Sequence, residues 1–463
     1  MHVAIIGAYG SAGVAAAQVL ADREDVELTL IDGGDPGGGL CILRGCMPSK
    51  EVYSAGAHRF QARHDDRLSG TPTVDLDAVI DRKNDHIEDF ASHRRAAVHD
   101  LADREGVEFI DERATLREDR TVTVDDLELD ADYVLVATGS QPNVPDLPGL
   151  DGVPYSTSDE VLDATDFGDS GIVMGFGYVG VEMAPYLAEA GGMDLTVIEH
   201  DARPLDEADD VFGDAMADIY REAFGIDIRT NVAELSVESG PAGDVRLSVE
   251  HESGREETFE AEELFVFTGR RPTLPAGIEE LGLDPSPGWV EDTMQANGDP
   301  QVFVIGDANG REPILHVAKE QGFLAAENVL RHARGDELRS YENTHHHVIF
   351  SGLGVYPYTR VGYSADAAAE AGLDSVTVTR RAADDGVFET KDVPEGLARL
   401  VVATDGTVLG YQGLHYQADA MAKTMQVIIE CGLSVDDIPD RAYHPTTPEI
   451  LDGLLREAGD AIE

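Results

Sequence analysis

Two cysteines, Cys41 and Cys46, stand five residues apart in a glycine-rich segment. A thiol can bind a metal, exchange with a disulfide or form a structural cross-link. Structural disulfides are rare in a reducing cytosol, so redox or metal chemistry is the stronger interpretation of this pair. A zinc site would need two more ligands at suitable spacing, and none stands nearby. The third cysteine, Cys431, lies in an apolar helical stretch and is expected in the core.

Two glycine-rich turns, far apart in the chain, repeat one pattern. In each, an apolar strand (3–6 or 171–174) enters the turn, a helix follows, and the next strand (28–31 or 195–198) ends in an acid. The acid is Asp32 in the first unit and Glu199 in the second, and it follows the third glycine by 19 residues in both (32 − 13 and 199 − 180). This spacing is typical of a dinucleotide-binding βαβ unit, in which glycines let the backbone approach a pyrophosphate and the acid accepts ribose hydroxyls.

The first turn departs from the pattern, because Ala8 stands where the leading glycine belongs, as if Tyr9 were inserted after Gly7 and Ala8. Three more apolar strands that end in glycine are expected at 133–136, 264–267 and 302–305. After about residue 340 the pattern changes, and antiparallel strands are expected at 348–351, 376–378 and 398–402, with a helix at 419–431. The sequence therefore predicts a third domain at the C-terminal end.

The segment 37–50 resembles the active-site segment of class I pyridine nucleotide–disulfide oxidoreductases, the family of dihydrolipoamide dehydrogenase, glutathione reductase and mercuric reductase. The family reads Gly-Gly-Thr-Cys, three variable residues, Gly-Cys, one variable residue and Pro-Ser-Lys; here Leu40 replaces the threonine. The resemblance extends over nearly the whole chain. It implies an α/β fold with an FAD domain (1–148 and 270–338), an NAD(P) domain (149–269) and a C-terminal α+β dimerisation domain (339–463), the first two being Rossmann-like.

By this resemblance, Cys41 is the thiol that exchanges with substrate and Cys46 is the thiol that contacts the flavin. Five residues of regular helix rise about 7.5 Å, whereas the Cα atoms of a disulfide are usually less than about 7 Å apart. We therefore expect a distorted turn, which Gly45 permits, and strain of that kind makes a disulfide easier to reduce.

The resemblance assigns further site residues. Lys50 lies by the flavin and pairs with Glu182, and His444 is the acid/base that Glu449 orients. Because the family takes the His444 segment from the partner subunit, a homodimer with shared active sites is implied. The FAD site is expected to use Gly7, Ala8, Gly10, Gly13, Asp32, Lys50, Ala137, Thr138, Gly139, Gly306, Asp307, Leu315 and His316. The NAD(P) site is expected to use Gly175, Gly177, Gly180, Glu199, Gly269 and Arg270.

The expected activity is electron transfer between NAD(P)H and a dithiol or disulfide substrate, with dihydrolipoamide as the leading candidate. Glu199 favours NAD, because a carboxylate repels the 2′-phosphate of NADP, although His200 and Arg203 are basic neighbours.

A reductase for bis-γ-glutamylcystine or glutathione disulfide is the alternative, since the cysteine loop differs from the usual one and Arg44 would favour an anionic disulfide. Mercuric reductase fits less well, because the chain's end lacks a cysteine pair. A subunit that keeps FAD only for folding is an alternative from another class, and a 2-oxoacid dehydrogenase complex is a further candidate partner.

The formal net charge of −56 is extreme. Self-repulsion of this size destabilises a compact chain at low salt, and it is largely screened at about 1 M salt, where the Debye length is roughly 3 Å. We therefore expect a halophilic cytoplasmic protein that binds neither nucleic acid nor membranes.

The sequence shows no signal peptide and no apolar run near the roughly 20 residues that span a bilayer. No metal site is expected at His345, His346 and His347, because adjacent strand residues face opposite ways.

Overall fold

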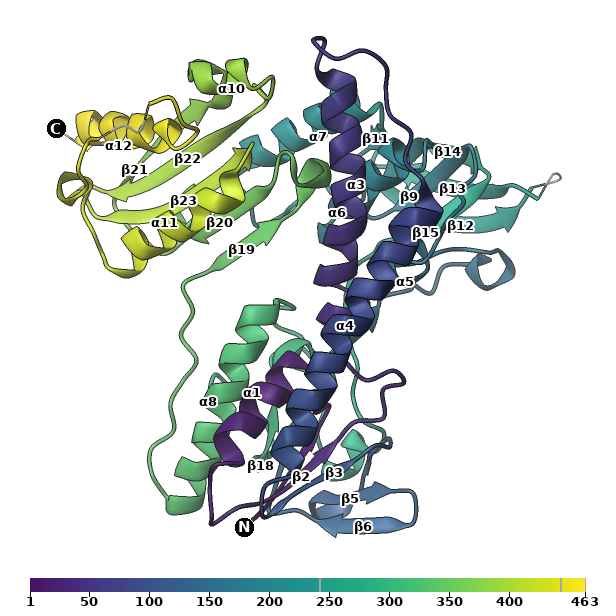
Figure 1. The fold of residues 1–463 in the computed structure, drawn as a ribbon, viewed down its shortest axis with the longest axis vertical. Coiled ribbons are helices and arrows are strands. Elements are labelled where there is room, and N and C mark those ends of the chain that lie inside the picture. The colour runs from purple at the N-terminus through teal and green to yellow at the C-terminus, as the bar shows by residue number, and fades with distance from the viewer. Residues whose placement is uncertain (241–242, 442–443, 463) are drawn as a thin grey trace. The chain divides into compact units, whose positions relative to one another are not determined.

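The computed structural model describes residues 1–240, 243–441 and 444–462 (Figure 1). The chain forms two compact units, each assembled from three separate stretches of sequence. Unit 1 contains Met1–Ser49, Asp81–Asn143 and Arg270–Asn343, and unit 2 contains Lys50–Ile80, Val144–Gly269 and the residues from Thr344 onward. Each unit therefore holds one of the two glycine-rich turns.

Unit 1 is built on a six-stranded sheet with the order β17-β18-β7-β1-β2-β3. The strands are β1 (His2–Ile6), β2 (Glu27–Ile31), β3 (Val107–Ile110), β7 (Tyr133–Val136), β17 (Gln295–Ala296) and β18 (Asp299–Val304). All neighbours run parallel except β17, which is antiparallel to β18. Helices α1 (Ser11–Leu20) and α8 (Leu315–Arg334) pack against each other, and Figure 1 shows them side by side.

The residues of β1 are suited to a central parallel strand because they are buried on both faces. Val3 and Ile5 belong to one buried cluster, which includes residues of α1 and α8, and Ala4 and Ile6 belong to another. Since alternate strand residues face opposite sides of a sheet, both faces of this strand are covered. A continuous apolar run is the pattern expected of such a strand.

The remaining elements of unit 1 are short. A three-stranded antiparallel sheet contains β4 (Thr115–Leu116), β5 (Thr121–Val124) and β6 (Leu127–Asp130), and β8 (Ser140–Pro142) pairs with β16 (Arg270–Pro272). Helix α2 (Leu40–Leu43) follows β2. Helices α3 (Cys46–His64) and α4 (Leu76–Ala102) have residues in both units.

Unit 2 contains a four-stranded parallel sheet with the order β11-β10-β9-β15. Its strands are β9 (Ser170–Met174), β10 (Asp194–Ile198), β11 (Asp227–Arg229) and β15 (Glu263–Val266), and its helices are α5 (Ser158–Val161), α6 (Tyr178–Glu189) and α7 (Asp210–Phe224). An antiparallel sheet of β12 (Val232–Ser239), β13 (Val245–His251) and β14 (Glu256–Ala261) interrupts the sequence before β15. The second glycine-rich turn thus joins β9 to α6, as the first joins β1 to α1.

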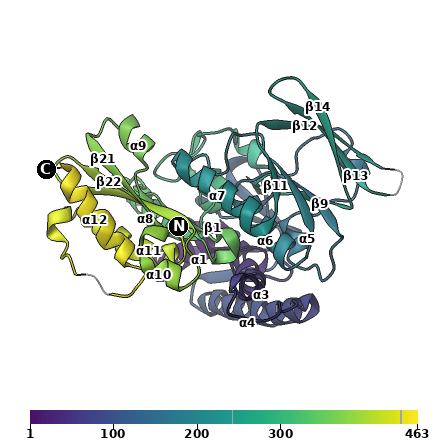
Figure 2. The ribbon, with the colours of Figure 1, turned by 90° about the horizontal axis from the view of Figure 1, so that it is seen from above.

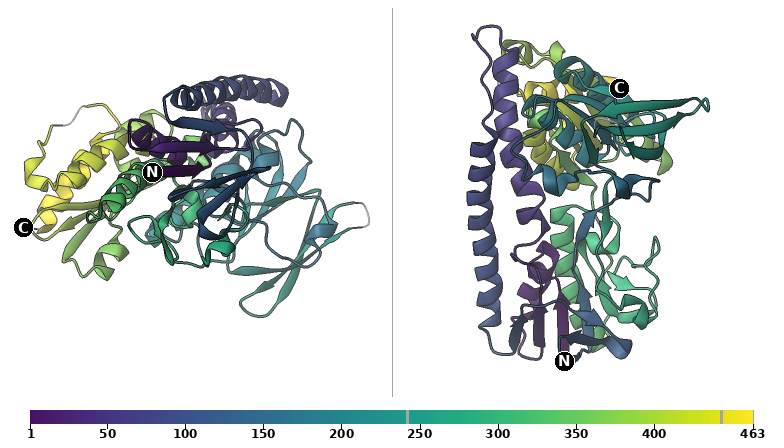
Figure 3. Two further views of the ribbon diagram at one scale, coloured as in Figure 1. Left: turned by 90° about the horizontal axis from the view of Figure 1, so that it is seen from below. Right: turned by 90° about the vertical axis from the view of Figure 1, so that its right-hand side faces the viewer.

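The C-terminal part of unit 2 is a five-stranded antiparallel sheet with the order β19-β20-β23-β22-β21. Its elements are β19 (His346–Ile349), β20 (Tyr358–Gly362), α9 (Ala365–Glu370), β21 (Ser375–Arg381), α10 (Gly386–Thr390), β22 (Gly396–Ala403), β23 (Val408–His415), α11 (Ala418–Glu430) and α12 (Glu449–Ile462). Helix α11 contacts β20 and β23, and α12 contacts β21 and β22. Figure 1 labels all of these elements, and Figures 2 and 3 show the same sheet and its yellow C-terminal helix from other sides.

These elements confirm the α/β fold class. The strands expected at 3–6, 28–31, 133–136, 171–174 and 195–198 all lie within observed strands, and the helix expected at 419–431 is α11. Strands β20 and β23 were missed; β23 includes two glycines, which weaken a strand pattern. Among the described residues, no helix has the length and apolar character needed to cross a membrane.

Candidate redox site and nucleotide-binding turns

Cys41 and Cys46 lie on two separate helices that follow one another in the chain. Helix α2 ends at Leu43, Arg44 has non-helical dihedral angles, and α3 begins at Cys46. A side chain at Gly45 would place its Cβ 3.1 Å from the Cα atom of Cys41, which is tighter than most Cβ contacts, so glycine favours this close return of the backbone. The structure therefore contains the distorted turn that the spacing of the two cysteines predicts.

The two sulfurs are close enough to interact. Cys41 is half-buried and Cys46 is exposed, and both are free thiols in this structure. A side-chain hydrogen bond with Cys46 is the largest cause that raises the pKa of the Cys41 thiol above its usual range, and burial is the second. A pair in this arrangement can close to a disulfide when it loses two electrons and two protons.

Arg94 is a neighbour of this pair that the sequence did not indicate. Its positive charge acts on Cys41 and lowers the pKa of that thiol, against three larger effects that raise it. Burial lowers the pKa of the Arg94 guanidinium itself, and its Nη1 donates to the backbone oxygen of Tyr9 at 3.1 Å. Arg94 comes from α4, about fifty residues after Cys41, so no local motif could have identified it.

The first glycine-rich turn is led by Gly7, and this corrects the expectation that Ala8 occupies that position. Gly7 has φ +97°, and a Cβ there would lie 2.4 Å from the backbone oxygen of Ala137. A Cβ at Gly13 would lie 2.2 Å from the oxygen of Gly7. Gly10 is the N-cap of α1. Two residues, Ala8 and Tyr9, therefore separate the first two glycines, where the common pattern has one.

Asp32 holds this longer turn in place. Its carboxylate accepts hydrogen bonds from the backbone N–H groups of Tyr9 at 2.8 Å and Gly34 at 2.9 Å. Burial raises the pKa of Asp32, although both hydrogen bonds act in the opposite direction. A cavity of about 530 Å³ opens beside Asp32, and it is lined by Tyr9, Gly33, Gly34, Asp35, Pro36, Gly37, Arg95, Asp111 and Glu112. A ligand of nucleotide size can enter such a cavity.

The second turn has the common spacing. Gly175 has φ +92°, and a Cβ at Gly180 would lie 2.2 Å from the oxygen of Gly175. A Cβ at Gly177, the N-cap of α6, would meet no atom within 4 Å, so the backbone faces open space there. The buried carboxylate of Glu199 accepts from the backbone N–H groups of Phe176 at 2.7 Å and Asp201 at 2.9 Å.

The ends of two neighbouring strands bring further predicted residues together in unit 1. Asp307 follows β18, and its Oδ2 accepts from the hydroxyl of Ser140 at 2.6 Å. Arg270 donates from Nε to the same hydroxyl at 3.0 Å. Arg270 therefore lies with Asp307 in the unit of the first turn, while Gly269 ends the stretch that belongs to unit 2.

The other predicted residues of unit 1 lie at the ends of its elements. The hydroxyl of Thr138 donates to the backbone oxygen of Thr273 at 2.5 Å, and Gly139 has φ +71°. Gly306 donates from its backbone N–H to the buried amide of Gln321. Ala137, Leu315 and His316 complete the set: Ala137 is buried directly after β7, and Leu315 and His316 begin α8.

Lys50 and Glu182 form an ion pair inside unit 2. The Nζ atom of Lys50 lies 2.8 and 2.7 Å from the two carboxylate oxygens of Glu182. The backbone N–H of Phe350 donates to one of these oxygens at 2.8 Å, and its ring centre lies 4.5 Å from Nζ. Phe350 was not expected from the sequence, because it contributes a backbone group and a ring face rather than a chemical motif.

His444 and Glu449 are also brought together. Nδ1 of His444 lies 2.9 Å from Oε1 of Glu449, and the His444 side chain is 79% exposed whereas that of Glu449 is 21% exposed. Glu449 begins α12, which fixes its position. The outward-facing imidazole is therefore oriented by one carboxylate and is available to a second molecule.

The structure differs from the expectation for Cys431, and it places two of the three adjacent histidines together. Cys431 is exposed at the C-cap of α11 rather than buried. His345 and His347 lie side by side, with 2.7 Å between Nε2 of the first and Nδ1 of the second. The argument from opposite strand faces holds for His346, but not for two residues separated by one.

Comparison with known proteins gives a family for most of the chain. Residues 1–322 match the family described as pyridine nucleotide-disulphide oxidoreductase, and residues 348–454 match the dimerisation domain of the same family. The dihydrolipoyl dehydrogenase of Halobacterium salinarum is 28% identical over 466 residues, which cover 96% of this chain and 94% of that protein. The mercuric reductase of Bacillus cereus is 29% identical over 334 residues, which cover 70% of this chain and 51% of that protein.

Solved structures of similar fold cover the chain from end to end. The HOCl-induced flavoprotein disulfide reductase RclA from Escherichia coli has a TM-score of 0.81 at 23% identity, covering 98% of this chain and 99% of its own. LpdA from Mycobacterium tuberculosis has a TM-score of 0.82 at 22% identity, covering 99% of both chains.

Proposed function

Because the chain belongs to the pyridine nucleotide–disulphide oxidoreductase family, we propose that Cys41 and Cys46 are its redox pair. The chain is an FAD- and NAD(P)-dependent oxidoreductase that acts on sulfur groups. The observation that carries the proposal is the hydrogen-bond contact between the two thiols across the break at Gly45. Dihydrolipoamide is the proposed substrate, and the relatives named dihydrolipoyl dehydrogenase support it.

The residues fit both cofactors. In unit 1, a Cβ at Gly7 or Gly13 would collide with backbone atoms, the first turn of α1 begins at a glycine, and a cavity opens beside Asp32. In unit 2, Gly177 leaves open space at the start of α6. Unpaired N–H groups at a helix start favour a pyrophosphate. When bound, FAD and the nicotinamide nucleotide would exchange electrons and hydride with the cysteine pair, in the direction that the substrate sets.

The sulfur chemistry is carried by residues of the chain. A substrate dithiol deprotonated by His444 attacks Cys41 of the oxidised pair, and the Cys41–Cys46 bond breaks with Cys46 leaving as a thiolate. The second substrate thiol then attacks the sulfur that bonded to Cys41, which releases Cys41 and an oxidised substrate disulfide. Two electrons and two protons thus pass from substrate to enzyme. Glu449 would hold the imidazole of His444 in the orientation for proton transfer.

The proposed dimer explains the exposure of His444. Nothing in the described part of the same unit covers this ring beyond Glu449, and residues 348–454 match a dimerisation domain. We propose that His444 acts in the partner's active site, so that two copies share two sites. Association with a 2-oxoacid dehydrogenase complex is part of the dihydrolipoamide proposal.

NAD is the proposed nucleotide. Glu199 is only 4% exposed and carries its charge where the ribose would lie. The two basic residues that could have favoured NADP are both engaged by acids: Arg203 with Asp214 at 2.6 Å, and His200 with Glu199 at 3.0 Å and with Asp201 at 3.2 Å. A 2′-phosphate would enter an acidic environment, and like charges in close contact are unfavourable.

Arg44 supports a second candidate, a reductase for a small anionic disulfide such as bis-γ-glutamylcystine. Its side chain is exposed directly between the two cysteines. A cation there attracts an acidic disulfide and offers nothing to neutral lipoamide. Arg44→Val should raise KM for an anionic substrate and leave KM for dihydrolipoamide unchanged.

The test is a reductive titration followed by turnover assays in molar KCl. Titration with NADH should produce a long-wavelength thiolate–flavin band at the two-electron stage, and Cys46→Ser should abolish it. Turnover is then compared for lipoamide, bis-γ-glutamylcystine, glutathione disulfide and Hg(II), each with NADH and NADPH. Absence of bound flavin, or full turnover in Cys41→Ser or Cys46→Ser, would refute the redox pair.

A further inference from the structure

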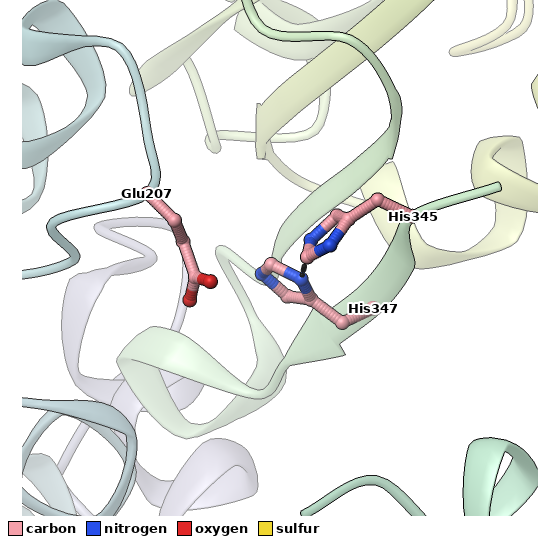
Figure 4. A group of neighbouring side chains, drawn as sticks. All are labelled: Glu207, His345 and His347. Carbon is pink, nitrogen blue, oxygen red and sulfur yellow. Dashed lines mark hydrogen bonds between the residues drawn. The ribbon is translucent and has the colours of Figure 1, made fainter. Parts of the chain in front are cut away.

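Three side chains of types that can ligate a metal ion meet in unit 2, and none of them has a part in the electron transfer described above. Glu207 lies between β10 and α7, His345 directly precedes β19, and His347 is the second residue of β19. One ligand atom from each residue lies within 4.8 Å of the others. Figure 4 shows the carboxylate of Glu207 directed toward the two imidazole rings.

The extended backbone explains why the two histidines form a pair. Residues two apart on a strand project to the same side, and Nε2 of His345 shares a hydrogen bond of 2.7 Å with Nδ1 of His347. The intervening His346 forms a separate hydrogen bond, from Nδ1 to the backbone oxygen of Thr344 at 2.6 Å. The strand thus provides two adjacent imidazoles and, between them in sequence, a matched control residue.

The surroundings hold these side chains in place. The ring centre of His347 lies 5.6 Å from those of both Tyr178 and Tyr358, and His347 is 6% exposed. Arg360 donates from Nη1 to the backbone oxygen of Glu207 at 2.5 Å, which fixes the loop that carries the carboxylate. Ligands whose orientation is already restricted lose little entropy when they bind an ion.

The charges near this cluster act on a bound cation in opposite directions. Arg360 opposes a bound cation, whereas the carboxylate of Glu207 and the chain's net charge of −56 favour one.

We propose that Glu207, His345 and His347 form a binding site for a divalent transition metal ion, with Zn²⁺ as the representative. Two imidazoles and one carboxylate are a common zinc ligand set, and they leave a fourth position for water or an external ligand. Metal–ligand bonds of about 2.1 Å place tetrahedral ligand atoms roughly 3.4 Å apart. The 2.7 Å between the imidazole nitrogens must therefore open slightly, and the Glu207 carboxylate must move inward.

The test uses the oxidised holoenzyme in a Cys431→Ser background and in molar KCl, so that the protein offers no free thiol. Equilibrium dialysis against ZnCl2, followed by metal analysis, should give one tightly bound Zn²⁺ per chain. His347→Ala and Glu207→Gln should each weaken this binding at least tenfold, and His346→Ala should not change it. FAD content and the unfolding temperature are measured for each variant, because His347 is buried.

A second variant, His345→Asn, is needed in case His347→Ala does not fold. The amide of the asparagine can still form a hydrogen bond with His347, but it has little affinity for zinc. Unchanged Zn²⁺ binding in His345→Asn would overturn the proposal, as would the absence of stoichiometric binding in the unsubstituted site. His200→Ala tests the exposed group Glu199, His200 and Asp201. Loss of the ion in that variant, with retention in His345→Asn, would assign the metal there and overturn the proposed site.

Discussion

The ammonium group of Lys50 lies within 2.8 Å of both carboxylate oxygens of Glu182, although 132 residues separate them in the chain. Glu182→Gln should keep the contact with the N–H of Phe350 but remove the charge that orients Lys50. We expect the rate of flavin reduction by NADH to fall about tenfold, which corresponds to ~1.4 kcal/mol of barrier. Stopped-flow reduction measures this rate, and an unchanged rate in a variant with full FAD content would contradict the proposed role of the pair.

Glu189 should contribute strongly to the stability of unit 2. Its side chain is only 3% exposed, and it forms ion pairs with Arg59 and with Arg63. Glu189→Ala leaves two partly buried arginines without their partner. Loss of one partner of a buried pair costs ~3–5 kcal/mol, and because the arginines can regain some water we expect about 2–3 kcal/mol.

Urea unfolding at fixed KCl concentration measures this loss. The control is Asp65→Asn, which breaks a pair with Arg67, whose side chain is 62% exposed, and should change the free energy of unfolding much less. An equal effect of both substitutions would mean that burial of Glu189 does not matter.

Arg94 should assist the thiolate form of Cys41. Its charge lowers the pKa of that thiol, so Arg94→Met should raise the pKa. The pH profile for alkylation of Cys41 in the reduced enzyme should therefore move to higher pH, and mass spectrometry can locate the modification. Arg95→Met is the matched control, because Arg95 binds Gly37 and Glu88 instead. A profile that moves equally in both variants would argue for a general electrostatic effect.

The number of residues in each glycine-rich turn should match the length of the acidic side chain that accepts a hydrogen bond from it. The second turn has one residue between its first two glycines and a glutamate, whereas the first has two residues and the shorter Asp32. Both acids accept the N–H of the residue before the second glycine. Deletion of Tyr9 should cause loss of FAD on gel filtration, and Asp32→Glu in the deletion variant should restore part of it. Tyr9→Phe should retain FAD, and full retention in the deletion variant would show that no such coupling exists.

Salt should stabilise the protein well beyond ordinary ionic strengths. With a net charge of −56, repulsion within the folded chain is strong at low salt. The unfolding temperature should rise continuously between 0.1 and 1 M KCl, where the Debye length falls from about 10 to about 3 Å. Differential scanning calorimetry of the holoenzyme measures this rise, and a temperature that is independent of KCl would contradict a halophilic protein.

Local patterns in the sequence predicted the parts of the site that are local in the structure. The strand, glycine turn and acid of each βαβ unit lie within about thirty residues, and the break at Gly45 follows from the spacing of the cysteines alone. The sequence placed Ala8 rather than Gly7 at the position of the leading glycine. The inserted residue allows two alignments of this turn with the common glycine pattern, and the sequence alone favours neither. Only the positive φ of Gly7 and its contact with Ala137 decide between them.

The site residues that could not be predicted are those whose partners lie far away in the sequence. Arg94 reaches Cys41 from a different helix, Phe350 reaches Glu182 with a backbone group, and Glu207 meets His345 only in three dimensions. Cys431 was misplaced for another reason. An apolar helix was assumed to be buried on that side, but Val427 of the same helix is 50% exposed.

The composition of each unit from three separate stretches has a consequence for synthesis on the ribosome. Strand β7 (Tyr133–Val136) finds its neighbour β18 (Asp299–Val304) only after more than 160 further residues have been made. At 5–20 residues per second, that edge waits roughly 10–30 s with its hydrogen-bonding groups unpaired. The nascent chain is therefore open to aggregation during this interval, and a truncated protein that ends before Asp299 should be recovered as insoluble material.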